Sequence, residues 1–62
     1  MNVGRLRAER GLTQEALAFE SELHRTFVAH VERGARNASL ESIEKLAIAL
    51  GVPTFILLQP ID

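Results

Sequence analysis

The stretch that decides the fold is Thr13–Asn37, which reads TQEALAFESELHRTFVAHVERGARN. It predicts two short amphipathic helices joined by a tight turn. When residues 25–33 are placed 100° apart, the second helix divides into two arcs. One arc is mostly apolar and holds Phe27, Val28, Val31 and Glu32. The other is polar and holds Arg25, Thr26, Ala29, His30 and Arg33. The apolar arc belongs in a core, which leaves the polar arc facing outward.

The side chains of the polar arc suit the edges of DNA bases. An arginine such as Arg25 can grip O6 and N7 of one guanine, and Thr26 offers a methyl group for thymine as well as a hydroxyl. Ala29 is small enough to allow close approach, and His30 lies one turn beyond Thr26 on the same arc. We predict that Arg25, Thr26, Ala29 and His30 read bases. The alternative for each is an ordinary solvated surface residue or, for Arg25, a phosphate contact.

Length and composition allow one small helical domain. The chain has 62 residues, 47% of them hydrophobic, and no cysteine that could form a disulfide or a thiolate metal site. Few aromatic residues, with abundant leucine and alanine, favour packed helices over sheets. No window approaches 18 apolar residues and no signal peptide is recognisable, so we expect a cytoplasmic protein without a membrane partner.

Net charge argues mildly against nucleic acid, since seven basic residues face eight acidic ones and the pI is about 6.1. The distribution of charge is more favourable. Arginines gather at positions 5, 7 and 10 and again at positions 25, 33 and 36, whereas Glu41, Glu44 and Asp62 lie in the C-terminal third. We therefore expect a bipolar molecule with weak non-specific affinity for DNA.

The whole chain, 1–62, is predicted to be a single domain of five helices. The predicted ranges are 2–10, 13–21, 25–33, 39–50 and 55–58. Thr13 and Ser39 are good N-caps, while Gly11, Gly34 and Gly51 are natural stops. The predicted core positions of the fourth helix are Leu40, Ile43, Leu46, Ala47 and Leu50.

Further residues complete a pattern that resembles the phage-repressor (Cro/repressor, or XRE) helix-turn-helix family, and in particular the controller proteins of restriction–modification systems. The residues that carry the resemblance are Arg7, Gly11-Leu12-Thr13-Gln14, Leu17-Ala18, Leu23, Val31-Glu32-Arg33-Gly34, Arg36-Asn37, Ser39-Leu40 and Leu50-Gly51-Val52. Each is a weak signal, but their order and spacing together are specific.

The resemblance implies a compact five-helix domain with its helix-turn-helix at about 13–33. It implies that the helix at 25–33 enters the major groove, that the preceding helix points its N-terminus at a phosphate, and that a homodimer binds a palindromic operator. Two residues depart from the family. Glu22 stands where the turn usually has glycine, and Phe27 stands where controller-like members often have tyrosine.

Other residues, among them Arg33 at the end of the polar arc, are predicted to hold the DNA backbone or the fold. The expected backbone contacts are Thr13, Gln14, Arg33, Arg36 and Asn37. For Gln14 the alternative is plain solvation at a helix start. Glu32 lies on the buried arc, where a carboxylate needs a partner, and the resemblance implies Arg7, at the matching position of the first helix, for a structural ion pair. The alternative is an exposed pair that contributes little.

The C-terminal segment carries more apolar surface than one core can absorb. We predict that Phe55, Ile56, Leu57, Leu58 and Ile61 are shared between the monomer core and an isologous dimer interface, which makes the short helix at about 54–59 a dimer element. Phe55 and Leu58 are three residues apart and are expected to face the core. Ile56 and Leu57 are expected to turn outward.

These features favour a sequence-specific DNA-binding transcriptional regulator that acts as a homodimer on double-stranded DNA. The alternative is a protein-interaction module on the same scaffold, such as an antitoxin, which the acidic balance supports. No catalytic arrangement is present, and His24 and His30 are six residues apart without other ligands, so we expect neither an enzyme nor a metal site. No cofactor or small-molecule ligand is indicated.

Overall fold

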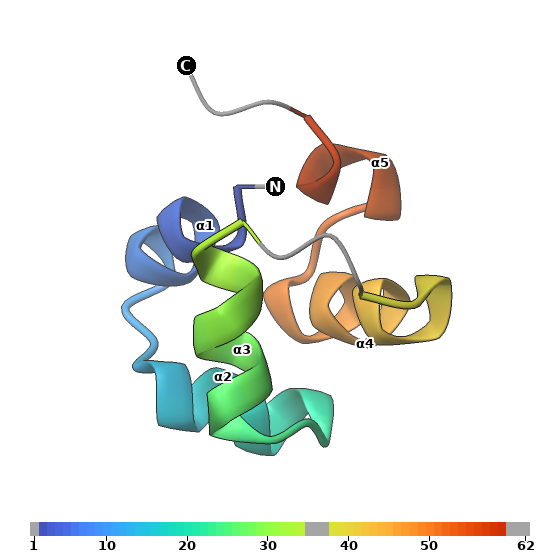
Figure 1. The fold of residues 1–62 in the computed structure, drawn as a ribbon. Helices are drawn as coiled ribbons and strands as arrows, with labels where there is room; N and C mark the ends of the chain where they lie inside the picture. The colour runs from blue at the N-terminus through green and yellow to red at the C-terminus, as the bar shows by residue number, and fades with distance from the viewer. Residues whose placement is uncertain (1, 35–37, 60–62) are drawn as a thin grey trace.

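The computed structural model describes residues 2–34 and 38–59 of the chain. Over these residues the protein consists of five helices without a strand, which confirms the predicted all-α class. The helices are α1 (Val3–Glu9), α2 (Gln14–Ser21), α3 (Arg25–Glu32), α4 (Leu40–Leu50) and α5 (Thr54–Leu57). Figure 1 shows α5 at the opposite end of the molecule from α2, close to the start of α1. Within the described ranges no helix is both long and apolar enough to cross a bilayer.

The helix boundaries follow the capping residues seen in the sequence. The Thr13 hydroxyl accepts a hydrogen bond from the Ala16 amide at 3.0 Å, and the Ser39 hydroxyl accepts one from the Ser42 amide at 3.1 Å. Each bond satisfies an amide that has no partner inside its own helix. At the other end of α4, Gly51 takes the left-handed conformation with φ 70°, which ends the helix.

The turn between α2 and α3 holds the one described residue other than glycine with a positive φ. Glu22 has φ 60° and ψ 35°. The Leu23 amide donates to the Ala18 carbonyl at 2.9 Å and closes the turn. A side chain in this left-handed conformation costs about 1–2 kcal/mol relative to glycine. Glu22 therefore lowers the stability of the fold relative to the glycine that the family resemblance implies at this position.

The core draws on every helix. Its fully buried side chains include Val3 from α1, Leu17 from α2, Val28 and Val31 from α3, Leu46 and Leu50 from α4, and Leu57 from α5. The buried Ser21 hydroxyl donates to the Leu17 carbonyl at 2.7 Å, so this polar group is satisfied inside its own helix.

One predicted core position of α4 is wrong. Leu40 is 65% exposed, although Ile43, Leu46, Ala47 and Leu50 are buried as expected. Helical periodicity does place Leu40 on the same side as Ala47. However, Leu40 belongs to the first turn of α4, and the described part of the chain puts no element over that turn. Periodicity predicts the face of a helix on which a residue lies. It does not predict how far along the helix that face is covered by the rest of the protein.

Candidate nucleic-acid interface

The two arcs predicted for α3 are present in the structure. Val28 and Val31 are fully buried, and Phe27 and Glu32 are partly buried beside them. The opposite side exposes Arg25, Thr26, His30 and Arg33, with Ala29 half-buried between them. Because the apolar arc fixes the rotation of α3, these side chains face solvent together. The structure thus brings four exposed hydrogen-bonding groups onto one helix surface.

A shallow hollow adjoins the beginning of α3. It has a volume of about 480 Å³ and is lined by Arg7, Thr13, Gln14, Glu15 and Arg25. Thr13 and Gln14 stand at the N-terminus of α2, where amide groups point outward and favour an anion. The hollow therefore joins two predicted backbone contacts to a predicted base reader. Glu15 was not singled out in the sequence, and its carboxylate disfavours an anion bound too deeply beside it.

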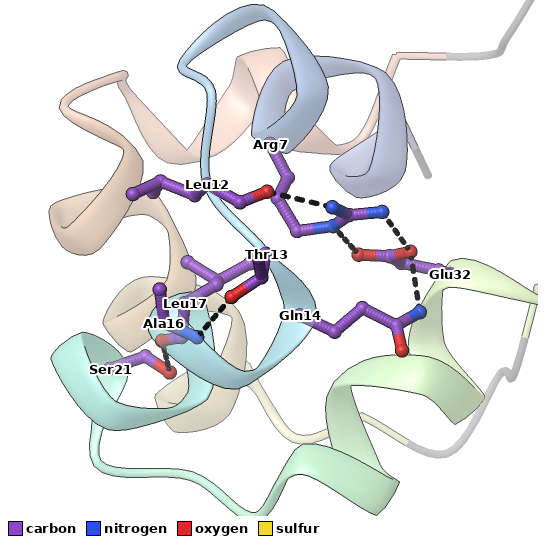
Figure 2. Close-up of polar contacts among 8 residues, drawn as sticks. All are labelled: Arg7, Leu12, Thr13, Gln14, Ala16, Leu17, Ser21 and Glu32. Atoms are coloured by element: carbon purple, nitrogen blue, oxygen red, sulfur yellow. Dashed lines mark hydrogen bonds and ion pairs between the residues drawn. The ribbon is translucent and has the colours of Figure 1, made fainter.

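A polar network lies behind this hollow and connects three helices (Figure 2). Arg7 on α1 donates to Glu32 on α3 twice, from Nε to Oε2 at 2.6 Å and from Nη2 to Oε1 at 3.2 Å. Its third bond runs from Nη1 to the carbonyl of Leu12 at 2.8 Å. The predicted ion pair between Arg7 and Glu32 is therefore present, with two parallel hydrogen bonds.

Gln14 belongs to the same network, which sequence reasoning did not anticipate. Its Nε2 donates to Glu32 Oε1 at 3.0 Å (Figure 2). Its amide oxygen and second N–H are not used in that bond and remain for other partners. The residue that opens α2 is thus tied to the residue that closes α3. No local pattern signals this bond, because residues 14 and 32 meet only after the helices pack.

The network decides the protonation of its carboxyl group. Partial burial by itself would raise the pKa of Glu32. The hydrogen bonds from Arg7 and Gln14, together with the positive charge of Arg7, outweigh burial and hold this pKa below its ordinary value. The hydrogen bond to Glu32 also raises the pKa of Arg7 against the effect of burial. Both groups are therefore charged at neutral pH.

Gly4 makes room for this arrangement. A methyl group added at Gly4 would lie 3.3 Å from Glu32 Oε1, closer than such contacts usually come. The absence of a side chain at this position in α1 lets the end of α3 approach. Sequence inspection missed this role, since a glycine inside a helix carries no sign of what lies against it.

The two arginines of α1, and Arg10 directly after the helix, contact other groups of the protein. Arg5 pairs with Glu9 at 3.1 Å on the surface, and Arg7 pairs with Glu32. The guanidinium of Arg10 lies against Gly51, where an added methyl group would come within 3.1 Å of Nη1. A cation there suits the C-terminal end of α4. The early arginine cluster therefore contributes less free positive charge than the sequence suggested.

The predicted orientation of α5 is wrong. Leu57 is fully buried, Ile56 is partly buried, and Phe55 and Leu58 are 63% and 54% exposed. A helix of one turn has too few residues for periodicity to fix its rotation. The rotation is set instead by packing against α4 and by the Leu57 carbonyl, which accepts a hydrogen bond from the Asn2 amide at 3.3 Å.

Three predicted residues lie outside the described part of the chain. Arg36 and Asn37 were expected at the DNA backbone, and Ile61 at the dimer interface. Within residues 2–34 and 38–59, no group of three histidine or acidic side chains is placed to hold a metal ion.

Comparison with known proteins places this geometry in a family. The helix-turn-helix model HTH_3 matches residues 3–57. Control protein C.BamHI of Bacillus amyloliquefaciens is 58% identical over 41 residues, which cover 66% of this chain and 51% of that protein. A hypothetical transcription factor of Neisseria meningitidis serogroup B is 46% identical over 59 residues, covering 95% of this chain and 56% of that protein. The chain thus spans about half the length of these two curated relatives.

Solved structures agree with this result. The restriction-modification controller protein C.AhdI from Aeromonas hydrophila superimposes with a TM-score of 0.85 and is 51% identical, covering 89% of this chain and 83% of that one.

Proposed function

Since the chain belongs to the XRE-type helix-turn-helix family of DNA-binding regulators, we propose that it is a sequence-specific transcriptional regulator whose α3 enters the major groove. The observation that carries the proposal is the single exposed arc of Arg25, Thr26, Ala29, His30 and Arg33 on α3. This arc follows directly after the turn and lies beside the polar hollow at the N-terminus of α2. Because the protein is proposed to bind DNA, we also propose a cytoplasmic location.

The proposed contacts divide into base readers and backbone contacts. Arg25 stands at the beginning of α3 and would grip a guanine, with Thr26, Ala29 and His30 facing the neighbouring bases. Thr13 and Gln14 at the start of α2, and Arg33 at the end of α3, would hold phosphates. Arg36 and Asn37 are proposed backbone contacts in the connection that follows. The bond from Gln14 to Glu32 supports this assignment, because it fixes the side chain beside the hollow.

We also propose that the regulator works as a homodimer on a palindromic operator. One helix-turn-helix covers a single half-site, and two half-sites about 34–36 Å apart require a two-fold partner. The short helix at about 54–59 remains the proposed dimer element, with the corrected orientation of α5. Phe55 and Leu58 would meet the partner, Ile56 would lie at the edge, and Leu57 would support the interface from the core. Ile61 stays a proposed contact.

Relatives that are named control proteins suggest a biological setting. C.BamHI and C.AhdI carry that description, the latter as a controller of restriction-modification. We propose a similar regulatory task for this chain.

A protein-interaction module is the second candidate. Two large apolar side chains, Phe19 on α2 and Ile48 on α4, are 84% and 80% exposed, which suits contact with another protein. Charge balance points the same way, since the chain has one acidic residue more than its basic residues. The two candidates differ in their affinity for DNA.

Selection of bound DNA from a random pool, followed by binding titrations at several salt concentrations, separates them. We expect one palindromic sequence and a steep fall of affinity with salt. Arg25→Ala should cost roughly 1–3 kcal/mol of binding and relax the preference at one base pair of each half-site. Lys45→Ala is the matched control, because it removes a positive charge from α4 and should leave the selected sequence unchanged. Failure to enrich any sequence would favour the interaction module.

A further inference from the structure

Asn2 is a buried polar residue that lies outside the proposed DNA interface. Asn2 is 1% exposed, and neither its Oδ1 nor its Nδ2 has a hydrogen-bond partner within the described part of the chain. Its backbone N–H donates to the Leu57 carbonyl at 3.3 Å, a long bond that connects the beginning of α1 to α5. An amide group buried without partners disfavours the state that buries it. The contact between α1 and α5 therefore carries a built-in penalty.

The same residue has a better arrangement within reach. Asparagine is among the preferred N-cap residues, with an extended backbone that lets its oxygen accept an amide bond from the first turn. Asn2 stands at the N-cap of α1, but its φ of −104° and ψ of 35° are not extended, and its side chain caps no amide. Rotation into the extended region would bring Oδ1 toward the Arg5 amide. That rotation would also move the backbone N–H away from Leu57.

We propose that Asn2 is a two-position latch between α1 and α5. In the latched position, seen in the structure, Asn2 is buried and its backbone holds α5. In the released position its side chain caps α1, and α5 loses its hydrogen bond to the rest of the fold. The two positions are close in free energy, because the lost backbone bond and burial are offset by a satisfied amide and a helix cap.

Release of α5 would also affect the proposed dimer interface. In the latched position Leu57 is buried while Phe55 and Leu58 are exposed. A partner that binds those two side chains favours the latched position, so dimer formation and latching support each other. This link rests on the proposed dimer function, whereas the latch itself does not.

Hydrogen exchange measured by NMR on the whole chain tests the latch. The Leu58 amide, bonded to the Phe55 carbonyl, reports on α5, and the Val52 amide, bonded to the Ala47 carbonyl, reports on α4. Asn2→Leu keeps the size and removes the unsatisfied amide, so exchange at Leu58 should slow about tenfold relative to Val52. Asn2→Asp cannot bury its charge and caps α1 well. It should speed exchange at Leu58 by up to about twofold, the limit for a released position that is already about half populated, and slow it at Arg5.

Thr13→Ala is the control, since it removes the cap of α2 and should speed Leu58 and Val52 together. Three results would overturn the latch: equal exchange at Leu58 in all Asn2 variants, parallel changes at Leu58 and Val52, or faster exchange at Leu58 in Asn2→Leu. The last result would mean that the buried amide is satisfied in solution.

Sedimentation of the same proteins tests the link to the dimer. Asn2→Asp should weaken the dimer several-fold, whereas Asn2→Leu should tighten it by at most about twofold, because the two positions are close in free energy. A dimer constant that is unchanged in Asn2→Asp overturns the coupling. A parent protein that stays monomeric at every concentration contradicts the proposed dimer instead, and exchange still decides the latch.

Discussion

Glu32 and Asn2 are both polar residues beside α1: Glu32 lies against Gly4 and pairs with Arg7, whereas Asn2 is the N-cap of the helix. The Glu32 carboxylate receives three hydrogen bonds, two from Arg7 and one from Gln14, and connects α1, α2 and α3. The Asn2 amide receives none from the described residues, although it is the more deeply buried of the two. Burial alone therefore does not tell whether a polar residue holds a structure together. The partners decide: the three bonds to Glu32 connect α1, α2 and α3, whereas the Asn2 side chain adds no bond between α1 and α5.

The largest expected effect comes from removing the carboxylate. Glu32→Ala leaves Arg7 and Gln14 without their partner in a side-chain environment that is mostly buried, and we expect a loss of about 3 kcal/mol in the free energy of unfolding. Thermal unfolding followed by circular dichroism measures it. The double variant Arg7→Met with Glu32→Leu should recover much of the loss, because no charge is then left unpaired. A melting temperature unchanged in Glu32→Ala would show that the network does not stabilise the fold.

The next largest effect is a difference in stability between variants of two neighbouring leucines, Leu57 and Leu58. Leu57→Ala removes a fully buried side chain and should cost about 2–3 kcal/mol of stability. Leu58→Ala, its matched control, changes a side chain that is 54% exposed and should cost less than about 0.5 kcal/mol in the monomer. Urea unfolding at low protein concentration gives both values. Equal losses for the two variants would contradict the orientation of α5 described above.

The smallest effect sharpens the comparison through pH. The pKa of Glu32 is lowered in the folded protein, so its contribution to stability is fully present above the pKa of the unfolded chain, about 4.3. It is lost as pH falls through the lower folded pKa, with a slope of at most about 1.4 kcal/mol per pH unit. The free energy of unfolding should be measured over about four pH units, from about pH 6 to about pH 2. It should therefore fall less steeply with decreasing pH in Glu32→Gln than in the parent. Identical slopes would mean that the carboxyl titrates alike in both states.

Local features were predictable wherever the signal lies in neighbouring residues. Thr13 and Ser39 mark the beginnings of α2 and α4 because a hydroxyl can satisfy an amide only a turn away. The two arcs of α3 follow from its period. The ion pair between Arg7 and Glu32, which lie 25 residues apart, came instead from the family resemblance together with the rule that a buried carboxylate needs a partner. The family and the all-helical fold rest on the same local order of residues.

Packing over long distances in the sequence decided the rest. The rotation of α5, the exposure of Leu40, the bond from Gln14 to Glu32 and the use of Arg10 beside Gly51 depend on which surfaces meet. A one-turn helix has no periodicity to read, and the end of a long helix gives no sign of where its cover stops. The sequence by itself thus determined the helices, their caps and the face that meets solvent. Only the tertiary structure decided which polar groups find partners, because partners far apart along the chain are chosen by packing.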